Sequence, residues 1–203
     1  HVRTAAGETY EEPYDALLLS PGAKPLRPPI SGIESPRVLA LRSVPDAEAL
    51  RRLADQYAAT GRAVVVGGGF IGIEMAENLR ARGLSVTLVE AAPHVLAPFD
   101  ADMAKIVEKE MNENGVGLVL GDGVKEFKEE AQGILVRLAS GREVAADFVV
   151  LAIGVSPDTG FLQASGIALG ERGHILVNER METNVPEVYA VGDAVLTLDR
   201  QTK

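Results

Sequence analysis

The stretch Arg62-Ala63-Val64-Val65-Val66-Gly67-Gly68-Gly69-Phe70-Ile71-Gly72 decides the fold of this chain. Its β-branched run predicts a buried parallel strand that ends at Gly67. The residues that follow predict an amphipathic helix that begins at about Ile71. Gly67, Gly69 and Gly72 have the spacing G-x-G-x-x-G. In this motif the first glycine allows a sharp turn, the second leaves room for a pyrophosphate, and the third lets the helix pack closely on the strand.

A second strand and a terminal acid complete this βαβ pattern. The strand Ser85–Val89 ends in Glu90, eighteen residues after Gly72, where an acid that binds an adenosine ribose is expected. The start of the helix offers free N–H groups and a partial positive charge to phosphates. The loop Ala91-Ala92-Pro93-His94 has no Arg or Lys for a 2′-phosphate. The pattern therefore predicts an NAD(H) site, and the alternative is a βαβ unit whose turn binds nothing.

Composition excludes several classes of function. The 203 residues are 46% hydrophobic, enough for one large α/β domain or one and a half small ones. A net charge of −9 argues against a nucleic acid or an anionic membrane surface as partner. There is no cysteine, and His1, His94 and His174 lack metal-ligand spacing, so we expect no metal site and no cysteine nucleophile. Since no apolar run is long enough for a membrane helix and the start resembles no signal peptide, we expect a cytoplasmic protein.

Before the βαβ unit, the sequence predicts a polar hairpin over residues 1–12, a buried strand over 14–20 and a helix over 44–59. Between them, Pro25, Pro28 and Pro29 exclude a helix or a central strand. We interpret this proline-rich segment as a linker between two domains.

After Glu90, the sequence predicts a helix over 100–114, a strand over 116–120, an antiparallel β-meander over 125–144 and a buried strand over 148–153. The meander would replace a helix as the crossover on one face of the sheet. The apolar stripe that includes Met103, Ile106 and Met111 is expected to face the core. The last of these strands ends at Gly154, which should lie beside the dinucleotide.

The last fifty residues have a different character. Residues 161–166 predict a short helical turn, residues 175–177 predict a short strand, and the strand Val188–Val191 leads into Gly192 and Asp193. Asp193 is either a second contact to a polar ligand or the N-cap of a helix. His1 in place of Met and the polar stub Asp199–Lys203 suggest a piece of a longer protein.

Together these segments resemble the middle of a flavin-dependent pyridine nucleotide-disulfide oxidoreductase. Leu18-Leu19-Ser20-Pro21-Gly22-Ala23 is similar to the motif at which that family's chain leaves its FAD-binding domain, with Ser20 where Thr is usual. The segment Thr183–Asp193 is similar to the motif at which it returns. Within the family, the segment Gly68–Leu79 most resembles the branch of coenzyme A-disulfide reductases and NADH oxidases, and Val95–Asp100 with the following helix fits that branch too. The glycine-rich segment Gly67–Gly72 is called the phosphate turn below.

The resemblance implies an α/β fold in which a Rossmann-like, three-layer NAD(H)-binding domain, residues 30–154, lies between two incomplete FAD-domain segments, residues 1–29 and 155–203. It implies that Asp193 holds the ribityl chain of FAD. It places Phe70 where an aromatic ring covers the flavin, and Glu74 near the reactive edge of flavin and nicotinamide. Without the resemblance, Phe70 is better explained as a loop hydrophobe and Glu74 as an acid in the first turn of a helix, where it favours the helix dipole. The predicted cofactor-binding residues are therefore Gly67, Gly69, Phe70, Ile71, Gly72, Glu74, Glu90, Gly154 and Asp193.

The activity that the resemblance implies is hydride transfer from NADH to FAD. Electrons would then pass to a cysteine that reduces a coenzyme A disulfide, a polysulfide or a peroxide, in a homodimeric parent protein. The first FAD glycine motif and the redox cysteine are expected upstream and the dimerisation domain downstream, so we expect no catalytic residue here and an inactive isolated chain. The alternatives are a cysteine-free FAD-dependent NADH reductase that feeds a ferredoxin or a quinone, and a non-catalytic NAD-sensing module.

Overall fold

The computed structural model describes residues 1–58 and 60–197, so the predicted stub at Asp199–Lys203 and the predicted helix end at Ala59 lie outside the described residues. The chain divides into two compact units. The smaller one contains His1–Lys24 and Ser156–Lys203, and the larger one contains Pro25–Val155. The assignment of these units to FAD- and NAD(H)-binding domains stays a prediction.

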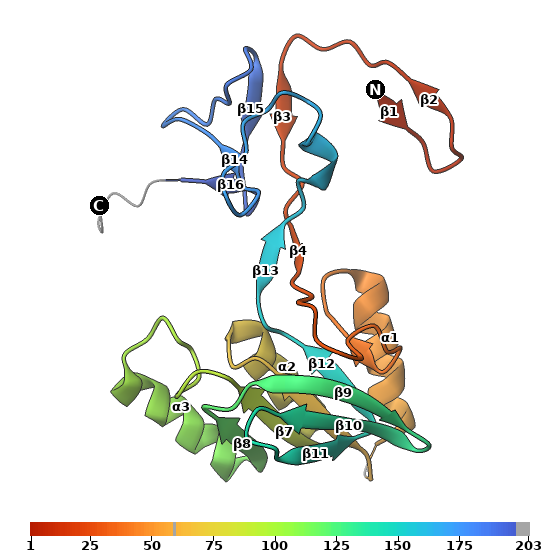
Figure 1. Cartoon of the computed structure of the whole chain (residues 1–203), viewed down its shortest axis with the longest axis vertical. Helices are drawn as coiled ribbons and strands as arrows, with labels where there is room; N and C mark the ends of the chain where they lie inside the picture. The colour runs from red at the N-terminus through yellow and green to blue at the C-terminus, as the bar shows by residue number, and fades with distance from the viewer. Residues whose placement is uncertain (59, 198–203) are drawn as a thin grey trace. The chain divides into compact units, whose positions relative to one another are not determined.

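The larger unit is built on a five-stranded parallel sheet (Figure 1). Its strands, in spatial order, are β5 (Val38–Leu39), β12 (Phe148–Leu151), β6 (Arg62–Val66), β7 (Ser85–Glu90) and β8 (Val116–Leu120). From β6 the chain moves outward through β7 to β8, whereas β12 pairs with the opposite side of β6. The strand order therefore reverses between β6 and β12, and such a switch point is where open α/β sheets bind ligands.

The larger unit has three layers, with the parallel sheet between a layer of helices and an antiparallel meander. The helices α1 (Val44–Gln56), α2 (Phe70–Ala81) and α3 (Ala101–Glu113) pack on one face, where Leu50, Leu79 and Met111 meet Val65 and Val150. An antiparallel meander of β9 (Val124–Glu130), β10 (Gly133–Leu138) and β11 (Glu143–Ala146) covers the other face. Both faces of the sheet are buried, which explains the continuous β-branched runs. The predicted three-layer α/β fold with a meander crossover is confirmed.

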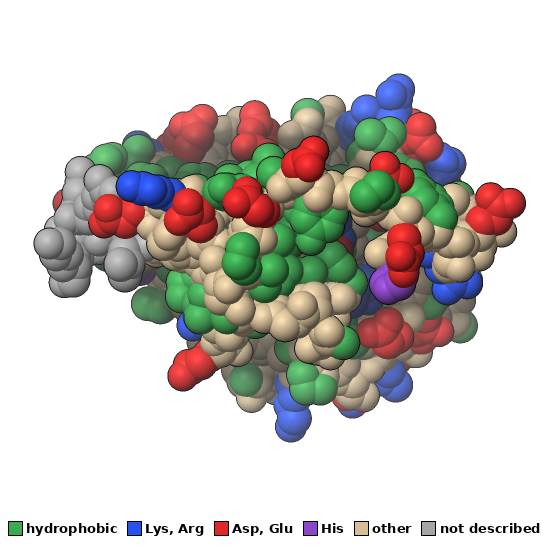
Figure 2. Space-filling view, turned by 90° about the horizontal axis from the view of Figure 1, so that it is seen from above, with side chains coloured by type: hydrophobic (Ala, Val, Ile, Leu, Met, Phe, Trp, Pro, Cys, Tyr) green, Lys and Arg blue, Asp and Glu red, His purple; other side chains and the backbone are tan. Residues whose placement is uncertain are grey.

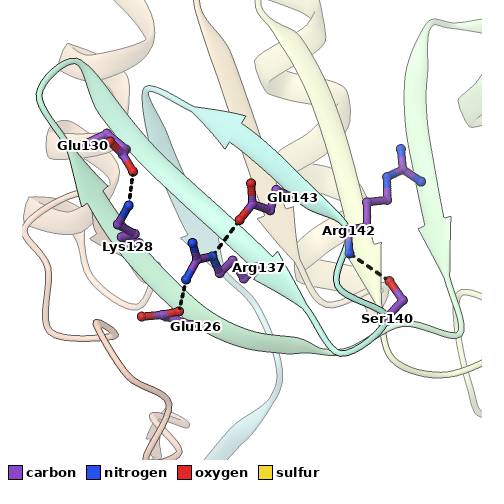
Figure 3. A network of polar contacts seen from close by, with 7 residues as sticks. All are labelled: Glu126, Lys128, Glu130, Arg137, Ser140, Arg142 and Glu143. Atoms are coloured by element: carbon purple, nitrogen blue, oxygen red, sulfur yellow. Dashed lines mark hydrogen bonds and ion pairs between the residues drawn. The ribbon is translucent and has the colours of Figure 1, made fainter.

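The outer face of the meander carries charged side chains in pairs (Figure 3). The Arg137 guanidinium contacts Glu126 at 3.0 Å and Glu143 at 2.7 Å, and these carboxylates raise the pKa of Arg137. Lys128 pairs with Glu130 at 2.7 Å. Exposed pairs of this kind contribute little to stability. The meander is therefore held mainly by its inner apolar face, where residues such as Val136 are fully buried.

The smaller unit consists of short strands. They are β1 (Val2–Arg3) with β2 (Thr9–Tyr10), β3 (Leu17–Leu19) with β15 (Val188–Ala190), and β14 (Ile175–Leu176) with β16 (Val195–Leu196), together with the 3₁₀ turn Gly160–Leu162. The strands β4 (Ala23–Pro25) and β13 (Val155–Pro157) also pair. No helix follows Asp193 within the part of the chain that the structure describes, so that part shows no helix for Asp193 to cap.

The expectation of a buried strand over 14–20 is wrong. The strand forms as β3, but its burial differs on its two faces: Leu17 and Leu19 are half-buried, whereas Leu18, which points to the opposite face, is 61% exposed. Tyr14 and Phe161 are exposed as well. Figure 2 shows hydrophobic side chains gathered on one face of the molecule with acidic side chains around them.

The expectation that the whole stripe of α3 faces the core is also wrong. Met111 is buried, but Met103 is 52% exposed and Ile106 is 63% exposed. The helix packs on β8, the edge strand of the sheet, so only one narrow side of it meets the core.

Candidate functional site

A cleft of about 600 Å³ lies at the carboxyl ends of β6, β7 and β12. Its lining residues all belong to the larger unit and are Ile30, Val66, Gly67, Gly69, Phe70, Ile71, Val89, Glu90, Ala91, Gly123, Val124, Ala152, Ile153, Gly154 and Val155. Six of the nine residues predicted to bind a cofactor are among them. The cleft coincides with the switch point of the strand order, so fold and cavity indicate the same site.

The three motif glycines meet different structural demands. Gly67 has φ +110°, and a Cβ on it would overlap the backbone of Ala152. A Cβ on Gly72 would overlap the carbonyl oxygen of Gly67, so Gly72 allows α2 to approach β6. Gly69 has φ −79° and ψ −174°, and a Cβ on it would meet no atom within 4 Å. The fold thus requires Gly67 and Gly72, whereas at Gly69 it leaves open space.

The phosphate turn presents the start of α2 to the cleft. Gly69 is the N-cap residue of α2, and the N–H groups of the first helical turn have no acceptor within the helix. The backbone N–H groups of the two residues before Gly69 already have acceptors. Gly67 N–H donates to the carbonyl oxygen of Val89 at 2.8 Å, and Gly68 N–H donates to Glu90 Oε2 at 2.5 Å. Donors for an anion are therefore those of the helix start.

Glu90 has two backbone partners at the end of β7. Its Oε2 accepts from Gly68 N–H, and its Oε1 accepts from Ala92 N–H at 2.7 Å. A carboxylate has about four acceptor positions, so these bonds leave capacity for ribose hydroxyls. The motif predicted the position of Glu90 in the cleft but not its bonds to the phosphate turn.

The remaining predicted residues lie in different places. Phe70 is 61% exposed and makes an edge contact with Phe99, with 6.1 Å between ring centroids. Glu74 is exposed and lines a separate groove between α1 and α2. Glu74 is therefore not among the residues that line the cleft. Asp193 is exposed and belongs to the smaller unit.

Sequence reasoning missed several residues that line the cleft or support it. Ile30, Gly123 and Val124 come from segments that no local motif marks, and Ile30 and Val124 pack against the apolar cluster between the sheet and the meander. Val95 and Leu96 are buried beside the phosphate turn, and their only sequence signal was the likeness of Val95–Asp100 to one branch of a family.

The described residues contain neither a cluster of metal ligands nor a membrane-spanning helix. No group of three His, Asp or Glu side chains suitable for a metal ion occurs among them. None of the described helices is long and apolar enough to cross a membrane.

Comparison with known proteins gives one family. The family model described as pyridine nucleotide-disulphide oxidoreductase matches residues 1–202. The coenzyme A disulfide reductase of Staphylococcus haemolyticus is 34% identical over 98% of this chain. The chain spans 43% of the length of that relative.

Solved structures agree in fold. Reduced Bacillus anthracis CoADR-RHD has a TM-score of 0.87 at 47% identity, over 94% of this chain and 34% of that one. The water-forming NADH oxidase from Lactobacillus brevis, solved with NADH bound, has a TM-score of 0.83 at 33% identity, over 91% of this chain and 40% of that one. With the family model matched over nearly the whole length, this chain belongs to the pyridine nucleotide-disulphide oxidoreductase family.

Proposed function

We propose that this chain binds NAD(H) in the cleft at the ends of β6, β7 and β12, as the NADH-binding part of an FAD-dependent oxidoreductase. The observation that carries the proposal is that position 69 has a glycine although the fold does not require one there. Its backbone conformation is open to any residue, and the space beside it is empty. A turn built for folding alone would have no need of glycine at this position. A pyrophosphate that approaches the backbone would need it.

The residues of the cleft fit a dinucleotide. The first N–H groups of α2 would hold the pyrophosphate, and Glu90 would accept from the adenosine ribose hydroxyls. Ile71 and Gly154 would border the rest of the cofactor, and Phe70 would lie where the family has a ring over the flavin. When bound, NADH supplies a hydride. The part of this chain is to bind and orient the cofactor and to exclude water from it with a mostly apolar wall.

The proposed electron acceptors rest on membership of the family. Hydride would pass from NADH to FAD, and electrons would then reach a cysteine outside this sequence that reduces a coenzyme A disulfide, a polysulfide or a similar small-molecule acceptor. The relative named coenzyme A disulfide reductase supports this acceptor class. Glu74 and Asp193 would serve the nicotinamide edge and the flavin ribityl chain in a parent protein that is a homodimer.

Titration of the purified protein with NADH, followed by the fluorescence of NADH itself, tests the proposal. The chain contains no tryptophan, so its own fluorescence interferes little. We expect saturable binding that ADP displaces, because ADP carries both the ribose and the pyrophosphate. Absence of binding would refute the NADH-binding role. Oxidation of NADH by the full-length protein with coenzyme A disulfide tests the acceptor, and activity with a ferredoxin or a quinone instead would favour the alternative reductase.

A further inference from the structure

The loop between β7 and α3 forms a hydrogen bond with the phosphate turn. The N–H group of Leu96 donates to the carbonyl oxygen of Gly68 at 2.8 Å. Leu96 is buried and has φ +51°, a left-handed conformation that residues with a side chain adopt at a cost. Strained residues of this kind persist where the surroundings impose them, often near functional sites.

This contact fixes a peptide group of the phosphate turn. The carbonyl of Gly68 and the N–H of Gly69 belong to one planar trans peptide, so they point in opposite directions. Because Leu96 holds the Gly68 carbonyl, the direction of the Gly69 N–H is set as well. On the other side of Gly68, Glu90 Oε2 holds its N–H group. Both peptide groups that flank Gly68 are thus oriented before any ligand arrives.

The loop is in turn fixed to α3. The N–H group of Val95 donates to Glu108 Oε1 at 3.1 Å, and Glu108 is half-buried on α3. Val95 is fully buried, and a Cβ placed on Gly68 would lie 3.1 Å from Val95 Cγ1. The side chain of Val95 therefore packs against the turn itself. A continuous set of contacts runs from Glu108 through Val95 and Leu96 to Gly68.

We propose that Glu108 is a positioning residue, which fixes the phosphate turn through Val95 and Leu96 in the form that receives a pyrophosphate. The inference rests on the proposed NAD(H) function. A turn that is already ordered pays no ordering cost on binding, so losing the anchor would weaken binding without removing any group that touches the cofactor.

Three substitutions on α3 separate this role from a general effect of charge or packing. Glu108→Met removes the acceptor and keeps a similar length, Glu108→Gln keeps an acceptor oxygen, and Glu113→Ala is the matched control. Glu113 is an exposed acid on the same helix, 3.7 Å from Lys109. We expect the dissociation constant for NADH to rise up to about tenfold in Glu108→Met. Glu108→Gln should recover most of the affinity, and Glu113→Ala should leave it unchanged.

Hydrogen exchange without ligand tests the anchor independently of NADH. In Glu108→Met the amides of Leu96 and Gly68 should exchange several-fold faster than in the wild type. Unchanged exchange at Gly68 would overturn the inference, as would faster exchange with an unchanged affinity for NADH. If the wild type itself does not bind NADH, the proposed function fails, and exchange at Gly68 alone decides whether Glu108 fixes the turn. Should Glu108→Met not fold, Glu108→Ala serves as the second variant in both measurements.

Discussion

Replacing Gly69 by valine separates binding from folding. The backbone of Gly69 has φ −79° and ψ −174°, so a valine adopts it without strain. A Cβ at this position meets no atom within 4 Å. Replacing glycine restricts the unfolded chain, which stabilises by about 0.4–1 kcal/mol, while valine is a poorer N-cap than glycine by a similar amount. These effects nearly cancel, so we expect a change in Tm of less than about 4 °C.

The effect on NADH should be much larger. The branched side chain would occupy the space through which a pyrophosphate reaches the first N–H groups of α2. Each charge-assisted hydrogen bond that is lost costs about 1.5–3 kcal/mol. One such bond corresponds to a loss of roughly tenfold to over a hundredfold in affinity, because about 1.4 kcal/mol is tenfold.

The assay is a pair of measurements on one preparation, thermal unfolding and NADH titration. Gly160→Val is the matched control, because a Cβ on Gly160 also meets no atom within 4 Å, and Gly160 is not one of the residues that line the cleft. It should change neither quantity appreciably. Normal NADH binding by Gly69→Val would refute the reasoning and make the glycine-rich segment a structural turn. A collapse of Tm would refute the claim that the fold does not need this glycine.

Three further predictions concern selectivity, flavin and pH. NADH should bind roughly ten- to several-hundredfold tighter than NADPH, because Glu90 repels a 2′-phosphate and the loop Ala91–His94 has no Arg or Lys. Equal or tighter NADPH binding at about pH 7.5 would contradict this. The purified 203-residue chain should be colourless and should not oxidise NADH, because a charge-assisted hydrogen bond from Asp193 contributes only about 1.5–3 kcal/mol, less than the roughly 4.1 kcal/mol that even millimolar affinity needs. A stoichiometrically yellow preparation would show that the domains are assigned wrongly. Hydrogen bonds from the side chain and backbone of Ser43 hold the pKa of Asp46 below its usual 3.8. The contribution of the Asp46 carboxylate to stability is therefore complete above pH 3.8 and is lost as pH falls through the lowered pKa of the folded state. Asp46→Asn should therefore lower Tm at about pH 7, by the equivalent of at most ~1 kcal/mol for this exposed cap, and the loss should shrink progressively as pH falls below 3.8. A loss that stays constant with falling pH would contradict the assignment.

The sequence predicts the parts of the fold that short segments determine. The run Ala63–Val66 is apolar at every position because these residues of β6 are covered on both faces, so strand, turn and helix follow from about twenty neighbouring residues. The meander is also determined by neighbouring residues, since each of its antiparallel strands joins the next through a tight turn. Glu90 also belongs to this group, because the acid and the glycines lie in one βαβ unit.

What the sequence could not predict depends on which element becomes a neighbour. Leu18 lies in an apolar run typical of a strand that is buried on both faces, but a side chain is buried only where another element covers its face of the sheet, and Leu18 is 61% exposed. Met103 and Ile106 have helical spacing, but the contact of α3 with an edge strand is narrower than the stripe. The bond from Val95 to Glu108 joins residues thirteen positions apart through a loop of irregular conformation, which no periodicity marks.

Glu90 has consequences for how cofactor selectivity should be measured. Its carboxylate would bind the ribose, and it also holds the N–H groups of Gly68 and Ala92. Glu90→Gln would leave one of these two donors facing an amide NH₂, so the turn loosens and the affinity for NADH and NADPH falls together. The loss of charge, in contrast, removes repulsion only from NADPH. The ratio of the two affinities therefore reports the electrostatic part, whereas either affinity alone mixes selectivity with the order of the phosphate turn.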